Sequence, residues 1–372
     1  MTAYAYVFIG LTITSSWGNG HATTYRALLR ALSQRGHEVL FLERDLPYYA
    51  PHRDLARAPY ARVEIYRDLA DLKRRFSRAV RDADLVVVGS YVPEGVAVNE
   101  WVLDLAPGRA AFYDIDTPVT LAALDRGDEA YVARAQVPRF DLYLSFTGGP
   151  TLDRLRDHFG ARRVRPLYCS VDPEAHAPER AERRWDLGYL GTYAEDRQPV
   201  LERLLIEPAR RLPEARFVVA GAQYPPLAWP ANVERRDHVA PSDHRLFYAS
   251  QRFSLNITRR DMALAGHSPS VRLFEAAACG VPVISDDWPG LDALFTPGRE
   301  ILVARGEDDV ARFLSEIDEP ERRAIGERAR ARTLAAHTAA HRAEALTAFT
   351  TEIRGSRPRP LAHDPAEDTD DS

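Results

Sequence analysis

Lysine is almost absent from this chain of 372 residues, because Lys73 is the only one and every other long basic side chain is an arginine. A guanidinium stays charged near neutral pH, so it binds anions through two parallel hydrogen bonds but does not act as a proton donor. Codon bias in a GC-rich genome accounts for the same composition without any role in binding. On either interpretation, cationic roles outside position 73 fall to arginine.

Cysteine and long apolar runs are scarce as well. Cys169 and Cys279 are too few and too far apart for a disulfide framework or a cysteine metal site, which fits a reducing compartment. No run approaches the roughly 20 apolar residues that span a bilayer. Residues 1–10 resemble a strand and lack the basic leader of a signal peptide. We therefore expect a cytoplasmic protein without a transmembrane segment.

The chain also lacks a strong excess of charge. Its formal net charge is −5 and its pI is near 6.2, so bulk electrostatics gives no reason to expect nucleic acid or an anionic membrane as partner. Any basic site must therefore be local. The length and the 45% hydrophobic content are sufficient for two α/β domains, each with its own core.

Strands and helices alternate in the first part of the chain. An apolar run at 4–9, a glycine-containing loop, a helical pattern at 23–34 and an apolar run at 38–42 predict a βαβ unit and hence a parallel sheet. The same alternation predicts further helices at 68–81 and 153–159 and strands at 85–88, 110–113 and 142–146. We predict an N-terminal α/β domain over residues 1–168.

A second alternating series begins at residue 187. It predicts strands at 187–190, 217–220, 253–257 and 281–285, and helices at 199–212, 243–250 and 269–279. A second doubly wound domain at 169–336 is the simplest interpretation. Two Ala- and Arg-rich helices follow at 320–337 and 339–353, and the Pro-containing acidic segment 354–372 is predicted to be disordered.

The most informative segment is residues 268–284, Ser-Pro-Ser-Val-Arg-Leu-Phe-Glu-Ala-Ala-Ala-Cys-Gly-Val-Pro-Val-Ile. Ser268 suits an N-cap, Pro269 the first helical turn and Gly280 the C-terminal cap. The helix N-terminus follows strand 253–257, where open α/β sheets bind ligands. Its amides at Ser270 and Val271 are therefore expected to receive phosphate oxygens.

Two charged side chains belong to the same predicted helix. A carboxylate at Glu275 can accept two ribose hydroxyls, and Arg272 can add positive charge near phosphate. The alternative is that Glu275 only complements the dipole of the helix.

Residues 268–284 resemble the donor-site signature of group 1 glycosyltransferases, and together with residues 113–118, Tyr-Asp-Ile-Asp-Thr-Pro, they resemble its CgeB-like branch. Residues 170–174, Ser-Val-Asp-Pro-Glu, are similar to the interdomain linker of these enzymes. The resemblance spans both predicted domains. It implies an α/β fold of GT-B type, in which two Rossmann-like domains face each other across a cleft and a C-terminal helix, here 337–353, packs back on the N-terminal domain.

The signature departs from the family at one position. The family carries a first glutamate eight residues before the second, and here that position is His267. The family's first glutamate contacts the donor sugar, so His267 either takes over this contact or is a loop histidine without that role. The departure leaves the identity of the sugar open.

Arginines are the candidates for binding the donor diphosphate. Residues 191–197 follow the first strand of the second domain and resemble the loop that supplies a pyrophosphate-binding cation, here Arg197. Arg259 or Arg260, which follow strand 253–257, is expected to supply a second one. Exposed arginines are common in this chain, so surface solvation is the alternative.

The loop after the first strand supplies the candidate catalytic base. Gly18 and Gly20 permit close approach of the backbone to a ligand, but Thr23 occupies the third position of a Gly-x-Gly-x-x-Gly dinucleotide motif, which disfavours a dehydrogenase. Some inverting GT-B enzymes place a histidine in this loop with an orienting aspartate about a hundred residues later. His21 and Asp116 resemble that pair.

Asp114 and Asp116 also form an Asp-x-Asp pair, which binds a divalent metal in GT-A enzymes. Because the donor signature lies in the second of two doubly wound series, we favour an acceptor-side or base-orienting role for these aspartates. The prediction is a glycosyltransferase that uses a nucleoside-diphosphate sugar without a metal or other cofactor. The alternatives are a sugar-nucleotide epimerase of the same fold and a non-catalytic sugar-nucleotide-binding protein of an envelope or spore assembly.

Overall fold

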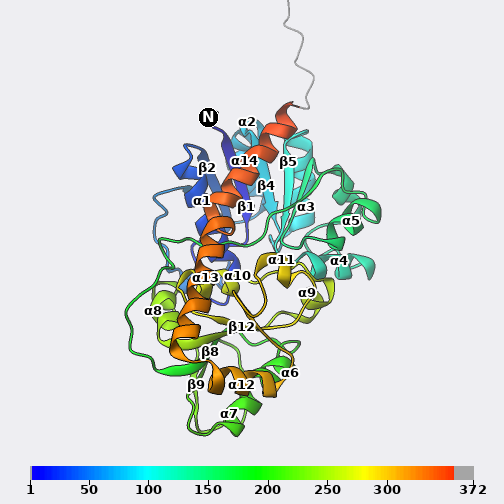
Figure 1. Cartoon of the computed structure of the whole chain (residues 1–372). Helices are drawn as coiled ribbons and strands as arrows, with labels where there is room; N and C mark the ends of the chain where they lie inside the picture. The colour runs from blue at the N-terminus through cyan, green and yellow to red at the C-terminus, as the bar shows by residue number, and fades with distance from the viewer. Residues whose placement is uncertain (1, 356–372) are drawn as a thin grey trace, which may run out of the picture.

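The structure is a computed structural model that describes residues 2–355. Two parallel β-sheets lie at opposite ends of the molecule, each flanked by helices (Figure 1). The first sheet has the order β3-β2-β1-β4-β5-β6-β7 and the second β10-β9-β8-β11-β12-β13. In both sheets the strand order reverses beside the strand that comes first in the chain, β1 or β8, and this reversal creates a crevice at the carboxyl ends of the strands.

The strands alternate with helices as the βαβ pattern predicts. The first sheet contains β1 (Ala5–Gly10), β2 (Glu38–Arg44), β3 (Arg62–Tyr66), β4 (Leu85–Gly89), β5 (Ala110–Asp114), β6 (Leu142–Ser145) and β7 (Val164–Pro166). The second contains β8 (Trp185–Leu190), β9 (Phe217–Ala220), β10 (Val233–Arg236), β11 (Gln251–Asn256), β12 (Val283–Asp286) and β13 (Leu302–Ala304). The chain therefore passes from one sheet to the other between Pro166 and Trp185.

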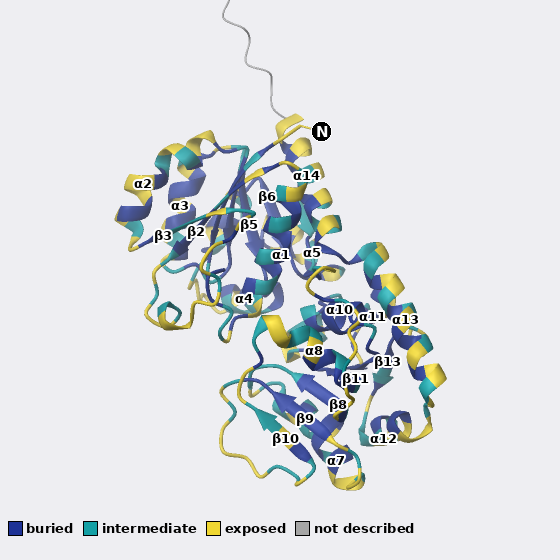
Figure 2. Ribbon diagram, turned by 90° about the vertical axis from the view of Figure 1, so that its left-hand side faces the viewer, coloured by how far each residue is buried: buried dark blue, intermediate teal, exposed yellow. Residues whose placement is uncertain are grey.

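The helices cover both faces of each sheet. In the first half they are α1 (Gly20–Gln34), α2 (Leu69–Asp82), α3 (Gly95–Leu105), α4 (Thr117–Asp125) and α5 (Pro150–Asp157). In the second half they are α6 (Gln198–Leu201), α7 (Glu207–Arg211), α8 (His244–Ala249), α9 (Arg260–Ala265), α10 (Val271–Ala278), α11 (Leu291–Leu294), α12 (Glu307–Glu316), α13 (Glu319–Ala336) and α14 (Ala339–Gly355). The central strands are buried and the outer faces of the helices are exposed (Figure 2).

The C-terminal helix α14 returns to the first half and lies beside α1 (Figure 1). Tyr6 Oη donates a hydrogen bond of 3.1 Å to Thr350 Oγ1, and Tyr4 Oη lies 2.9 Å from Thr351 Oγ1. The return path runs beside the outgoing one, because Val171 pairs with Thr338 in an isolated β-bridge. The amide of Val171 donates to His337 O at 3.1 Å, and the amide of Ala339 donates to Val171 O at 2.9 Å.

Several element boundaries differ from the prediction. The α10 helix begins at Val271 with Ser270 at its N-cap, so the predicted capping role of Ser268 and the helical position of Pro269 are wrong. The Ser268 hydroxyl instead lies 2.8 Å from Thr147 Oγ1 in the first half of the molecule. The predicted helix 199–212 contains a π-helical segment, η3 (Glu202–Ile206), where Pro208 removes a backbone donor.

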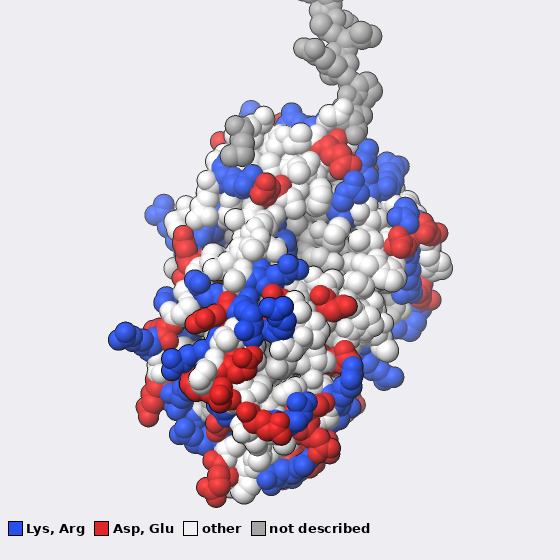
Figure 3. All heavy atoms as spheres, viewed as in Figure 1, with Lys and Arg blue, Asp and Glu red and all other residues white. Residues whose placement is uncertain are grey.

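The last helix is also longer than predicted at its C-terminus. Because α14 continues to Gly355, the first two residues of the predicted disordered tail are helical, and residues 356–372 lie outside the described part. No helix among residues 2–355 combines the length and apolarity needed to cross a membrane. Positive and negative side chains are interspersed over the face shown in Figure 3.

Candidate functional site

A cavity of about 490 Å³ lies where the crevices of the two sheets face each other. Its walls come from the loops after β1 and β4 on one side and after β8 and β11 on the other. The cavity thus combines the switch points of both sheets, where doubly wound folds bind ligands. Among the predicted site residues, those that line it are Gly18, Gly20, His21, Asp116, Arg197, Arg259, Val271, Arg272 and Glu275.

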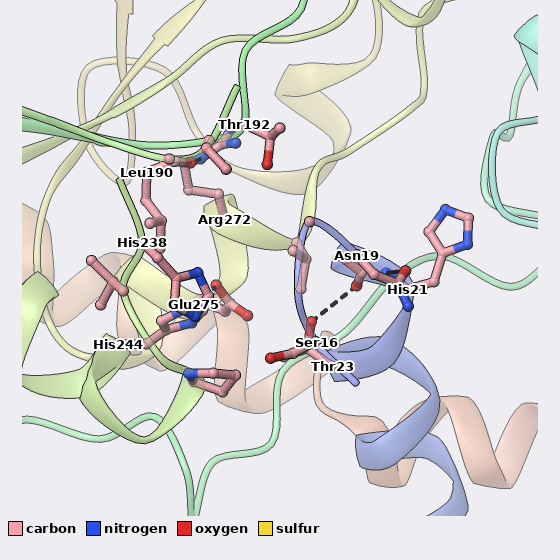
Figure 4. A pocket seen from close by; sticks show the side chains of 18 of the residues that line it. Ser16, Asn19, His21, Thr23, Leu190, Thr192, His238, His244, Arg272 and Glu275 are labelled. Atoms are coloured by element: carbon pink, nitrogen blue, oxygen red, sulfur yellow. Dashed lines mark hydrogen bonds and ion pairs between the residues drawn. The ribbon is translucent and has the colours of Figure 1, made fainter. Parts of the chain in front are cut away.

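The wall from the first half is formed by the β1–α1 loop. The Asn19 side chain caps α1, since its Oδ1 accepts a hydrogen bond of 3.0 Å from the backbone amide of His21. The backbone amide of Asn19 donates to Ser16 O at 3.1 Å (Figure 4). Gly18 has a φ of +58°, a left-handed conformation in which a side chain is strained. The loop therefore presents backbone to the cavity and fixes the direction in which α1 begins.

His21 and Asp116 are brought together without a direct hydrogen bond. His21 Nε2 lies 4.0 Å from Asp116 Oδ2, and His21 Nδ1 is buried without a hydrogen-bond partner. Tyr91 Oη donates to the same carboxylate oxygen at 2.8 Å. Burial lowers the pKa of His21 from its usual value, while the Asp116 charge opposes this shift and the Arg259 charge adds to it. The imidazole is therefore held in its neutral, proton-accepting form at neutral pH.

Arg259 crosses the cavity from the second half to the first. Its Nη1 donates to Asp116 Oδ2 at 3.3 Å, and its Nε lies 3.7 Å from Asp196 Oδ2. It is the one predicted cation that contacts both walls in the described chain. The neighbouring Arg260, the alternative candidate, begins α9, and its backbone amide donates to Asp196.

Asp114 is fully buried, and its Oδ1 accepts a hydrogen bond of 3.3 Å from the Asp116 amide. Tyr143 Oη and Thr120 Oγ1 donate to its two carboxylate oxygens at 2.7 and 2.8 Å. Complete burial is the main cause that raises the pKa of Asp114 to about 7, against the effect of these hydrogen bonds. The Asp114 carboxylate is thus held by neighbours inside the first half, whereas Asp116 lines the cavity, and the base-orienting role favoured for Asp116 stays a prediction.

The wall from the second half centres on the N-terminus of α10. Arg272 is buried on this helix, where its Nε donates to Leu190 O and its Nη1 donates to Asn256 Oδ1 at 3.1 Å. Ser270 Oγ donates to the same Asn256 oxygen at 2.6 Å. These bonds attach the first turn of α10 to the ends of β8 and β11, so the helix terminus points into the cavity in a fixed orientation.

Arg197 lines the same cavity from the start of α6. Its Nη2 donates to Thr192 O at 2.6 Å within the loop after β8, and its buried Nε has no hydrogen-bond partner. The guanidinium is thus positioned by its own loop and keeps donor capacity for an anion.

Glu275 is buried one turn further along α10, between two histidines and a tyrosine. Tyr248 Oη donates to Glu275 Oε2 at 2.9 Å, His176 Nε2 lies 3.7 Å from Oε1, and His244 Nδ1 lies 3.9 Å from Oε2. The nearby histidine charges and the tyrosine bond outweigh burial and lower the pKa of Glu275. An ionised carboxylate at the cavity wall can accept hydroxyl hydrogen bonds.

Three predicted donor-binding residues do not line the cavity: His267, Ser268 and Ser270. His267 has a φ of +49°, its carbonyl accepts a hydrogen bond of 2.9 Å from the Gly148 amide, and its side chain lines another depression beside Pro289. His267 and Ser268 therefore lie at the contact between the two halves, while Ser270 holds the start of α10.

Several residues of the site carry no signal in the sequence. Tyr91, His176, His238, His244 and Tyr248 lie at the cavity or directly behind it. Figure 4 shows His238 and His244 beside Glu275 and opposite Ser16, Asn19 and His21. Each is a single polar or aromatic residue without a local motif, so only the position of His176, two residues after the linker-like segment 170–174, could have drawn attention.

A known family matches part of the second half of the chain. Residues 197–348 match the model of a family described as glycosyl transferase-like, and this segment includes Arg197, Arg259 and all of α10. No curated protein matches the chain.

Solved structures resemble the chain over nearly its whole length. Sucrose-phosphate synthase from Thermosynechococcus elongatus is 14% identical with a TM-score of 0.68, and the match covers 95% of this chain and 100% of that one. Anabaena HepE in complex with UDP-glucose is 13% identical with a TM-score of 0.69, covering 95% and 99%. An α-glucosyltransferase in complex with UDP-glucose and DNA is 13% identical with a TM-score of 0.71, covering 94% and 100%. The predicted fold is confirmed, and the chain has the GT-B fold with a glycosyl transferase-like segment in its second half.

Proposed function

We propose that the protein transfers a sugar from a nucleoside-diphosphate sugar to an acceptor hydroxyl, without a metal at the diphosphate. The observation that carries this proposal is the composition of the cavity: a helix N-terminus, arginines and a buried carboxylate on one wall face a neutral histidine on the other. The UDP-glucose complexes of two structural neighbours support a donor of this class.

In this proposal the donor binds to the second half of the molecule. The diphosphate lies at the N-terminus of α10 near Val271, where helix amides and the charge of Arg197 and Arg259 stabilise it. Glu275 accepts hydroxyls of the ribose. Ser270 holds the start of α10, and Ser268 and His267 act through the contact between the two halves.

The transfer step uses the opposite wall. His21 accepts the proton of the acceptor hydroxyl while the hydroxyl oxygen forms a bond to the anomeric carbon of the sugar. The bond from that carbon to the diphosphate oxygen breaks at the same time, and the leaving nucleoside diphosphate carries the electron pair. Arginine charge and helix amides stabilise this negative charge as it develops. Asp116 stabilises the protonated imidazole, and Gly18 and Gly20 leave room for the reacting groups.

Further parts of the proposal concern the chain as a whole. The passage between sheets after Pro166 and the return after His337 support the predicted domains 1–168 and 169–336. Cys169 and Cys279 are both free and buried, which supports a cytoplasmic location. Residues 113–118 and 268–275 remain the basis for the CgeB-like branch, which stays a prediction.

A donor screen tests the proposed function. The protein is heated with a panel of nucleoside diphosphates and their sugars, because a ligand of the folded state raises the unfolding temperature by mass action. Release of nucleoside diphosphate from the stabilising donor is then measured with and without candidate acceptors. Acceptor-dependent release supports sugar transfer. Conversion of donor without any acceptor identifies the epimerase alternative, and binding without conversion identifies a non-catalytic binding protein.

A further inference from the structure

Three side chains at the cavity wall or directly behind it form a cluster that the proposed transfer does not need as a whole. His176 comes from the segment between β7 and β8, His244 begins α8, and Glu275 lies on α10. One ligand atom from each lies within 4.8 Å of the others. It is the one group of this kind among residues 2–355.

The histidines of this cluster have unused hydrogen-bonding capacity. His176 is 7% exposed, and neither of its ring nitrogens has a hydrogen-bond partner. His244 Nδ1, which faces Glu275, is buried without a partner as well. Leaving a buried polar atom without a partner is destabilising, so such atoms in a folded protein usually have a ligand or an ordered water.

The carboxylate does not satisfy these nitrogens. Its distances to His176 Nε2 and His244 Nδ1, 3.7 and 3.9 Å, exceed those of a hydrogen bond. Donor atoms bound to one tetrahedral zinc ion lie roughly 3.3 Å apart, given metal–ligand bonds of about 2.0 Å. Small side-chain rotations would therefore bring the three atoms onto one ion.

The surroundings of the cluster fit an ion as well. Tyr248 Oη donates to Glu275 Oε2, and a hydrogen bond to the Val239 backbone holds His244. Outer contacts of this kind fix the orientation of imidazole and carboxylate ligands in metal sites. The positive charge of Arg272 acts on Glu275 and would repel a metal ion, but this guanidinium is already hydrogen-bonded to Leu190 and Asn256.

We propose that His176, His244 and Glu275 form a binding site for a divalent first-row transition-metal ion such as Zn²⁺. Two imidazoles and one carboxylate are the ligands of zinc sites that keep a fourth position open. His244 and Glu275 line the cavity, so that position faces the ligand space. The site shares Glu275 with the proposed donor site, so metal binding is measured without nucleotide, and it revises the expectation of a protein without metal.

Binding of Zn²⁺ to tag-free protein, stripped with a chelator and dialysed, tests the site by calorimetry. We expect one ion per chain. The double variant His176→Ala/His244→Ala should bind at least 100-fold more weakly, whereas His238→Ala, a histidine at the same cavity outside the cluster, should bind normally. Absence of stoichiometric binding by the wild type would overturn the proposal, and so would unchanged affinity in a folded double variant.

A milder variant covers the case in which the double variant does not fold. Tyr248→Phe keeps all three ligands and removes only the hydrogen bond to Glu275, so affinity should fall about tenfold, in the range known for outer contacts. Substitution of Co²⁺ for Zn²⁺ gives a second measurement, because its visible absorption reports a low-coordinate site with nitrogen and oxygen ligands. A six-coordinate aqua-like spectrum, or unchanged affinity in Tyr248→Phe, contradicts the proposal.

Discussion

The two walls of the cavity are held together in different ways. On the wall from the second half, Arg272, Ser270 and Asn256 bond one another and the backbone of β8, so the N-terminus of α10 has a fixed direction. On the wall from the first half, His21 is 4.0 Å from Asp116 and has a free ring nitrogen. A fixed wall suits recognition of one donor orientation, whereas a wall with an unused proton acceptor suits the chemical step.

The largest expected effect comes from removing His21 from the wall of the first half. His21→Ala removes the proposed general base, so kcat should fall roughly 10²–10⁴-fold, the usual contribution of such a group. The dissociation constant of the donor should stay within about twofold, because the donor binds to the other wall. Steady-state kinetics and calorimetry measure the two quantities separately. A variant with near-normal turnover removes His21 from the mechanism.

The next largest effect comes from changing Glu275 on the wall of the second half. Glu275→Gln keeps the shape of the side chain but removes its charge, so nucleoside diphosphate should bind about 10–100-fold more weakly, since hydrogen bonds to a charged group contribute about 1.5–3 kcal/mol. Calorimetry in the presence of a chelator excludes any effect of bound metal. Glu300→Gln, at a distant turn, is the matched control. Unchanged affinity in Glu275→Gln contradicts the ribose assignment.

A smaller effect concerns the residue that joins the two walls. Arg259 pairs with Asp116 and Asp196 and is also proposed to bind the diphosphate, so Arg259→Ala should weaken donor binding and lower kcat together, each about tenfold. Arg260→Ala is the control, since only its backbone amide contacts Asp196. An Arg260→Ala loss equal to that of Arg259→Ala would reverse the assignment of the two arginines.

The smallest expected effect is a shift in the pH dependence of kcat/KM. Because the pKa of His21 is lowered, its base form persists below pH 6.5, and kcat/KM should fall only as pH drops through a value below 6.5. Asp116→Asn removes the charge that raises this pKa, so the acidic limb should move to still lower pH. A limb above pH 7, or one that moves upward in Asp116→Asn, is incompatible with His21 as the base.

The sequence predicted the fold because its helices carry local signals. Asp68 and Asp318 accept hydrogen bonds from Asp71 and Glu321 at the starts of α2 and α13, and central strands such as β4 are continuous apolar runs. Edge strands such as β10, Val-Glu-Arg-Arg, were missed, because they are short, polar and defined only by pairing with a neighbour.

The residues of the site also fall into two groups, those that belong to a local motif and those that only packing brings together. Glu275 and Arg272 belong to a contiguous motif, and both line the cavity, as do Gly18 and Gly20. His176 and His244 come together only because a connecting segment and α8 both pack against α10, which no local pattern encodes. The direction of His267 was equally hidden, since it depends on the contact between the two halves.

The bridge between Val171 and Thr338 ties together the two segments that connect the halves of the molecule. Both connections pass through one short hydrogen-bonded strip, so neither is held in place without the other. A substitution that breaks this strip would therefore loosen the outgoing and the returning connection together.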